Sequence, residues 1–274
     1  MGGPLIGALR RQQQPLILAA AGLVLAGLAL APLLWLLGAS VSGAGSTFRL
    51  LAAARPWALL LRSVLLASGV TVVALVLGTP LGLLIARADL PGRRALWLLH
   101  AFPLALPPFL LALGWFYLLG RNGLCGTPLT ARLLFGSGGA VAVMGLAFTP
   151  VVTSLVALGV LGVDASLEEA ARVVASPWRV ATRILLPAAR PSLVLAAIVV
   201  FALALSELGV PMFLRVEVFP AAVFARLGGI DYAPGEAFAL VLPLVPLALV
   251  LLALERRFVG PRSFAVGGVR GLAR

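Results

Sequence analysis

Long apolar stretches separated by short charged segments are the main pattern of the chain. Six stretches approach or exceed the roughly 20 residues that a helix needs to cross the hydrocarbon core of a bilayer. The last has only 18 residues between Glu236 and Glu255. The pattern predicts membrane-spanning helices at about 16–37, 63–86, 95–119, 138–163, 191–212 and 237–254. We therefore expect an all-α polytopic membrane protein, with residues 1–274 forming a single transmembrane domain of six helices.

A charged segment, residues 164–187, separates the fourth and fifth predicted spans. Ser166 and Glu169 have the spacing of a capping box, which predicts a short helix that starts at Leu167. Ser176 followed by Pro177 is a second start signal, because serine caps helices and proline is tolerated at the first helical position. We expect two short helices joined by a tight break. A folded polar loop of this kind suits docking by another protein.

The composition supports a membrane protein and indicates its orientation. The chain is 62% hydrophobic and 11% charged, whereas soluble domains are typically about 25% charged. All 21 basic residues are arginines. Fourteen of them fall on the side of the membrane that holds the termini and residues 164–187, and seven fall on the other. Because basic residues concentrate in cytoplasmic loops, both termini and the charged segment are predicted to be cytoplasmic.

Prolines and one carboxylate stand out inside the predicted spans. Pro103, Pro107 and Pro108 predict a broken third span, and Pro150 predicts a break at the middle of the fourth. A broken helix is tolerated in a membrane where protein or a water-filled cavity satisfies its freed backbone groups, so these prolines are candidates for the translocation pathway. Glu207 in the fifth span is either a pathway or gate residue or an internally bonded group, with Arg215 or Arg226 as the expected salt-bridge partner.

Several chemistries are excluded by the residues that the sequence lacks. Without lysine there is no Walker A motif, and with one histidine there is no HExxH zinc site. The single Cys125 excludes a disulfide framework, and no cluster of metal ligands is expected. Only Glu207 provides an intramembrane carboxylate, so an ion-coupled carrier is disfavoured. The chain is predicted to be neither an enzyme nor a cofactor-binding protein, and any energy for transport must come from a partner.

The charged segment resembles the EAA motif of the permease subunits of binding-protein-dependent ABC importers. Glu169, Ala170 and Ala171 match its beginning, and Ile184, Leu186 and Pro187 match its end. The glycine that the motif places between its two helices is absent here. The resemblance implies that residues 164–187 are the coupling loop that enters a groove of the ATPase subunit. It points to Glu168, Glu169, Ala170, Ala171, Arg172, Ser176, Pro177, Arg179, Leu186 and Pro187 as ATPase-coupling residues.

The same resemblance implies a set of partners and a location. These are a dimer of cytoplasmic ATPases that hold ATP and magnesium, a second permease subunit that is either the same chain or a paralogue, and a periplasmic or extracellular substrate-binding protein. The chain would be a multi-pass protein of the bacterial inner membrane, embedded in the lipid bilayer, with no nucleic-acid partner.

The substrate and two other classes of function stay open. The segments SELGVPMFL and FPAAVFARL and the basic tail favour ferric iron, with thiamine, polyamines, phosphonates and sulfate as alternatives. An ion-coupled secondary carrier would work without an ATPase, and a structural membrane protein would transport nothing. The proline-broken spans argue against the structural role.

Overall fold

The computed structural model describes residues 3–88, 91–229 and 232–259, and all regular structure in these residues is helical. Four segments are long and apolar enough to cross a membrane: Leu18–Ser42, Ala54–Arg87, Ser137–Leu161 and Pro234–Phe258. Two bent helix pairs raise the number of candidate spans to six if each pair is one span. The predicted all-helical membrane fold is therefore confirmed. The end of the basic tail, from residue 260 onward, lies outside the described residues.

The first three predicted spans correspond to helices whose bounds differ from the predicted ones. α1 (Gly3–Ser42) and α3 (Ala54–Arg87) extend beyond the predicted ends, with the short α2 (Ala44–Ala52) between them. The third span is broken, as its prolines predict. α4 (Arg93–Ala101) continues as a 3₁₀ turn, η1 (Phe102–Ala105), and then bends by 101° into α5 (Pro108–Leu119).

The fourth span differs from its prediction. After α6 (Pro128–Leu134), α7 (Ser137–Leu161) is one continuous helix, so the predicted break at Pro150 is wrong. A proline in a helix has no N–H to donate to the carbonyl four residues back, but within a membrane neighbouring helices can accommodate the freed backbone group, and Pro150 is buried against them. The fifth span, α11 (Arg190–Ser206), ends before Glu207.

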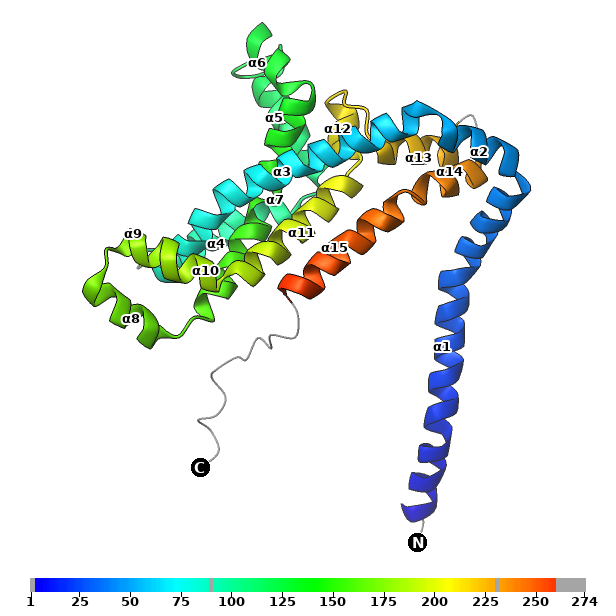
Figure 1. Cartoon of the computed structure of the whole chain (residues 1–274), viewed down its shortest axis with the longest axis horizontal. Helices are drawn as coiled ribbons and strands as arrows, with labels where there is room; N and C mark the ends of the chain where they lie inside the picture. Colours follow the sequence, from blue (N-terminus) through cyan, green and yellow to red (C-terminus); the bar gives the residue numbers. More distant parts are fainter. Residues whose placement is uncertain (1–2, 89–90, 230–231, 260–274) are drawn as a thin grey trace. The chain divides into compact units, whose positions relative to one another are not determined.

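Short helices occupy the connections and the C-terminal part. The charged segment forms α8 (Ala165–Val174), α9 (Pro177–Val180), the π turn η2 (Ala181–Leu185) and α10 (Leu186–Ala188), and α10 meets α11 at a bend of 69°. α12 (Gly209–Phe213) and α13 (Phe219–Gly228) follow α11 (Figure 1). The sixth span consists of α14 (Pro234–Val241) and α15 (Leu244–Phe258), separated at Leu242 and Pro243.

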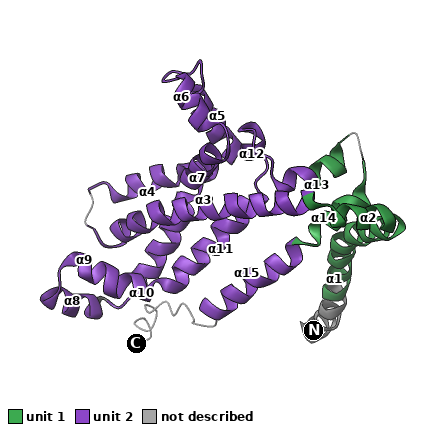
Figure 2. Ribbon diagram, turned by 45° about the horizontal axis from the view of Figure 1, so that its top comes forward, with its two compact units in different colours: residues 1–54, 223–243 green, residues 55–222, 244–274 purple. Residues whose placement is uncertain are grey.

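The chain divides into two compact units, residues 1–54 with 223–243 and residues 55–222 with 244–274 (Figure 2). In the first unit α14 packs on α1, where Gly235 lies against the backbone of Ala39 and Ser40. The larger second unit contains the bundle of α3, α7 and α11 and all the candidate functional residues named above.

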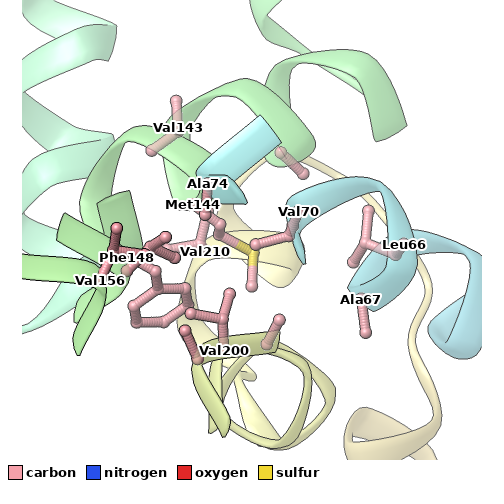
Figure 3. Close-up of a cluster of buried hydrophobic side chains, with 14 of the residues drawn as sticks. Leu66, Ala67, Val70, Ala74, Val143, Met144, Phe148, Val156, Val200 and Val210 are labelled. Atoms are coloured by element: carbon pink, nitrogen blue, oxygen red, sulfur yellow. The ribbon is translucent and has the colours of Figure 1, made fainter. Parts of the chain in front are cut away.

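The core of the second unit lies where α3, α7 and α11 meet. Val70 and Ala74 of α3 face Met144 and Phe148 of α7, with Val200 of α11 beside them (Figure 3). The approach of α3 to α7 is close because α3 carries glycines at the contact. A Cβ atom at Gly78 would lie 2.6 Å from the Cβ of Val152, and one at Gly82 would lie 2.8 Å from the Thr153 carbonyl oxygen.

Candidate functional site

The first helix of the charged segment starts earlier than its sequence predicts. Asp164, not Ser166, is the N-cap of α8: its Oδ1 accepts hydrogen bonds from the backbone N–H and the hydroxyl of Ser166, both at 3.0 Å. These two bonds lower the pKa of the Asp164 carboxyl. The predicted capping box is therefore wrong, and Glu169 is exposed. An aspartate closer to the helix start has taken the cap, which leaves Glu169 free for other contacts.

The break between α8 and α9 needs no glycine. Ala175 has φ −139° and ψ 150°, and Ser176 has φ −66° and ψ 153°. Both conformations are extended and open to any residue. Ser176 is the N-cap of α9 and Pro177 its first residue, as predicted. Two consecutive extended residues thus make the turn for which the EAA motif uses glycine.

Glu168 is buried, although it lies in a short surface helix. Only 5% of the residue is exposed. Its Oε2 lies 2.9 Å from Nε of Arg87, at the C-terminal end of α3, and its Oε1 accepts a hydrogen bond of 2.6 Å from Nη2 of Arg172. Nη2 of Arg87 also donates to the carbonyl oxygens of Val160 at 2.8 Å and Val163 at 3.2 Å. In the sequence, Arg87 was one of the fourteen arginines that indicate the orientation in the membrane. It is far from Glu168 along the chain, so no sequence motif linked the two residues.

The outer surface of the segment carries exposed apolar side chains. Val173 is 85% exposed, Val174 83% and Trp178 75%. Exposed apolar side chains that lie close together are candidates for contact with another protein. Sequence reasoning did not select them because apolar residues dominate the whole chain. Of the predicted coupling residues, Glu169, Ala170, Arg172, Ser176, Pro177 and Arg179 are exposed, and Ala171, Leu186 and Pro187 are half-buried.

The pathway candidates lie at two helix breaks and inside α7. Pro103, Pro107 and Pro108 lie where η1 gives way to α5. The edge of Phe109 in α5 packs on Phe213 of α12, with ring centroids 5.4 Å apart. The break in the third span therefore lies beside the break after α11. Pro150 is buried within α7.

Glu207 does not form the predicted salt bridge. Its Oε1 accepts hydrogen bonds from the backbone N–H groups of Gly209 at 3.0 Å and Val210 at 3.3 Å, which stabilise the start of α12. Arg215 lies over the ring of Phe135, and Arg226 pairs with Glu236 at 3.0 Å. Of the two interpretations of Glu207, the geometry supports the internally bonded group.

The described residues thus form an all-helical membrane protein with a polar helical loop between its fourth and fifth spans. Residues 78–260 match the family model described as binding-protein-dependent transport system inner membrane component. The chain belongs to this family: it is a permease subunit of an ABC importer and a multi-pass inner membrane protein. Permeases of this family are non-catalytic and hold no cofactor, and they work with an ATPase and a binding protein.

Several characterised proteins are similar to the chain. The molybdenum transport system permease protein ModB of Escherichia coli K12 is 28% identical over 70% of this chain and 90% of its own length. The molybdate/tungstate permease protein WtpB of Thermococcus kodakarensis is 33% identical over 54% of this chain and 56% of its own. FbpB 1 of Haemophilus influenzae, whose name refers to ferric transport, is 26% identical over 59% of this chain and 27% of its own length.

A solved structure supports the fold. The inward-facing MetNI methionine ABC transporter has a chain with a TM-score of 0.59 and 20% identity, covering 76% of this chain and 97% of that one. At this identity the similarity concerns the fold alone.

Proposed function

We propose that residues 164–187 are the cytoplasmic coupling loop of this permease and that they dock on the ATPase subunit through α8 and α9. The observation that carries the proposal is the exposure of Val173 and Val174 on α8 and of Trp178 on α9, while Glu168 on α8 is buried in contact with Arg87. Exposed apolar side chains on already folded helices favour a protein partner. Their burial gains hydrophobic free energy, and little conformational entropy is lost because the backbone is already ordered.

The predicted coupling residues divide into two roles in this proposal. Arg179 and Glu169 are exposed and free to contact the ATPase. Arg172 is bonded to Glu168 and supports the loop as well as offering charge to a partner. Val173, Val174 and Trp178 supply the apolar centre of the contact, and the polar residues of the same helices supply its edge, as in most protein interfaces.

We also propose that the transported substrate is molybdate or tungstate. The names of ModB and WtpB support this substrate, and the alignment with ModB extends over 90% of that protein. The ferric relative is matched over only 27% of its length. The proposal therefore replaces the preference for ferric iron that the sequence segments suggested. We propose further that both termini are cytoplasmic, that a second permease subunit lies beside this chain, and that the binding protein acts on the opposite side of the membrane.

The docking surface is tested by replacing Trp178 and Val174. The variant Trp178→Ala/Val174→Ser should insert normally but recover at least tenfold less ATPase subunit in a mild-detergent pull-down, because the apolar centre of the contact is lost. Leu124→Ser is the matched control, since Leu124 is equally exposed (89%) but lies in the loop between the third and fourth spans. Full recovery of the ATPase with the double variant would refute the proposed surface.

A further inference from the structure

Glu168 differs from every other charged residue in the part of the chain that the structure describes. It is the one that is buried, and it lies in a helix that is otherwise mostly exposed. An ionised carboxylate is costly to remove from water unless positive partners compensate it. Arg87 and Arg172 both do so, but only Arg87 belongs to the helical bundle, and its side chain is 22% exposed whereas that of Arg172 is 56% exposed. Arg172 of α8 makes the shorter contact, a hydrogen bond of 2.6 Å, and Arg87 is the partner that links the buried charge to α3.

Arg87 joins three helix ends through one guanidinium group. It belongs to the last turn of α3, it bonds the carbonyl groups of Val160 and Val163 at the C-terminal end of α7, and it pairs with Glu168 in the first turn of α8. The last carbonyls of a helix have no partner within the helix, and a positive charge there is favoured by the helix dipole. Nη2 donates to the two carbonyls, and Nε lies in ion-pair contact with the Glu168 carboxylate without forming a hydrogen bond to it. A planar guanidinium can face all three acceptors at once, which an ammonium group cannot do as well.

We propose that Arg87 and Glu168 are positioning residues that transmit movement of the coupling loop to the α3–α7 pair. This inference rests on the proposed docking of α8 and α9 on the ATPase. α3 and α7 are in close contact at Gly78 and Gly82, so they are expected to move as one body. The chain between α7 and α8 is only Gly162, Val163 and Asp164, and the Arg87–Glu168 pair adds a direct link between α8 and the bundle. Without this pair, α8 can shift on the ATPase without moving α3 and α7.

The first test is Arg87→Gln in the complete importer. We expect the ATPase subunit to co-purify as with the wild type, uptake of substrate to fall at least tenfold, and ATP hydrolysis to lose its stimulation by the loaded binding protein. Arg226→Gln is the matched control because it also breaks a half-buried Arg–Glu pair, with Glu236, away from the loop. It should change uptake less than twofold. Wild-type uptake and wild-type stimulation in Arg87→Gln would overturn the inference.

The second test separates a joint role from two independent ones. Glu168→Gln keeps the shape of the side chain and removes the charge that needs Arg87, so it also serves if Arg87→Gln fails to assemble. If the two residues act as a pair, the double variant Arg87→Gln/Glu168→Gln should lose no more uptake than the worse single variant. Losses that multiply would overturn the inference. A wild-type chain that recovers no ATPase would instead refute the proposed docking function, so the two failures are distinguishable.

Discussion

Glu207 illustrates how a single residue at the interruption of a membrane span can have a local role. A carboxylate at membrane depth costs about 2.5 to 3.5 kcal/mol on insertion scales, which makes a functional role the first hypothesis. Here the carboxylate accepts the first free N–H groups of α12, where the fifth span is interrupted. Backbone donors released by a helix break need acceptors, and Glu207 supplies one at the point where the break occurs.

This interpretation predicts different effects for two substitutions of Glu207. Glu207→Ala removes the acceptor and should lower the free energy of unfolding by about 1 kcal/mol. Glu207→Gln keeps a carbonyl oxygen in the same place and should retain most of the stability and the uptake. Thermal denaturation in detergent and uptake by the complete importer are the measurements. A stable Glu207→Gln variant that no longer transports would show instead that the charge is needed in the pathway.

At the scale of elements, the contact between α3 and α7 depends on two glycines of α3 that face two valines of α7. Gly78 and Gly82 lie one turn apart on α3 and meet Val152 and Val156 of α7. Because lipid competes for apolar side chains, helices in a membrane gain most from close packing, which small residues permit. The spacing of the two glycines was visible in the sequence, but their partners on α7 were not.

Gly82→Ala is therefore expected to destabilise the bundle. The new Cβ would lie 2.8 Å from the Thr153 carbonyl oxygen and from the Cβ of Val156, and forcing one methyl group into a packed contact costs about 1 to 3 kcal/mol. The expected result is a lower midpoint of thermal denaturation. Gly27→Ala in α1 is the control: no atom lies within 4 Å of its added Cβ, so the substitution should leave the midpoint unchanged or raise it slightly. Equal effects at the two positions would contradict the packing argument.

At the scale of the whole molecule, the chain is the non-catalytic membrane subunit of an ABC transporter. Its family supplies the energy for transport through an ATPase, and its binding protein presents the substrate. The second unit combines both parts that the permease needs: the broken helices of the third and fifth spans, and α8 and α9 with the Arg87–Glu168 pair.

The substrate proposal predicts uptake by the assembled importer. Proteoliposomes containing this chain, its partner subunits and the binding protein should accumulate radiolabelled molybdate when ATP is inside, and tungstate in excess should suppress the accumulation, because the two oxyanions share charge and shape. Ferric iron presented in the same way should not be accumulated, and vesicles with ADP provide the control. Iron uptake that molybdate does not inhibit would refute the proposal.

Much of the fold could be predicted because membrane insertion is decided locally. The free energy of placing a segment in lipid depends mainly on its own residues, so the apolar stretches and the positions of the charged segments indicate the helices. The proline-rich break in the third span and the start of α9 at Ser176 and Pro177 are local in the same way. Pro150 was misjudged because its effect depends on what surrounds it in α7.

By itself, the sequence determined that the chain is a helical membrane protein with a charged two-helix loop after its fourth span. These features follow from hydrophobicity and from capping within a few residues. Only the tertiary structure decided that Glu168 rather than Glu169 faces the bundle, that Arg87 is its partner, and that Ala175 replaces a glycine without strain. Arg87 and Glu168 are far apart in the chain, and their attraction arises only when α3, α7 and α8 have packed, because burial makes each charge depend on the other.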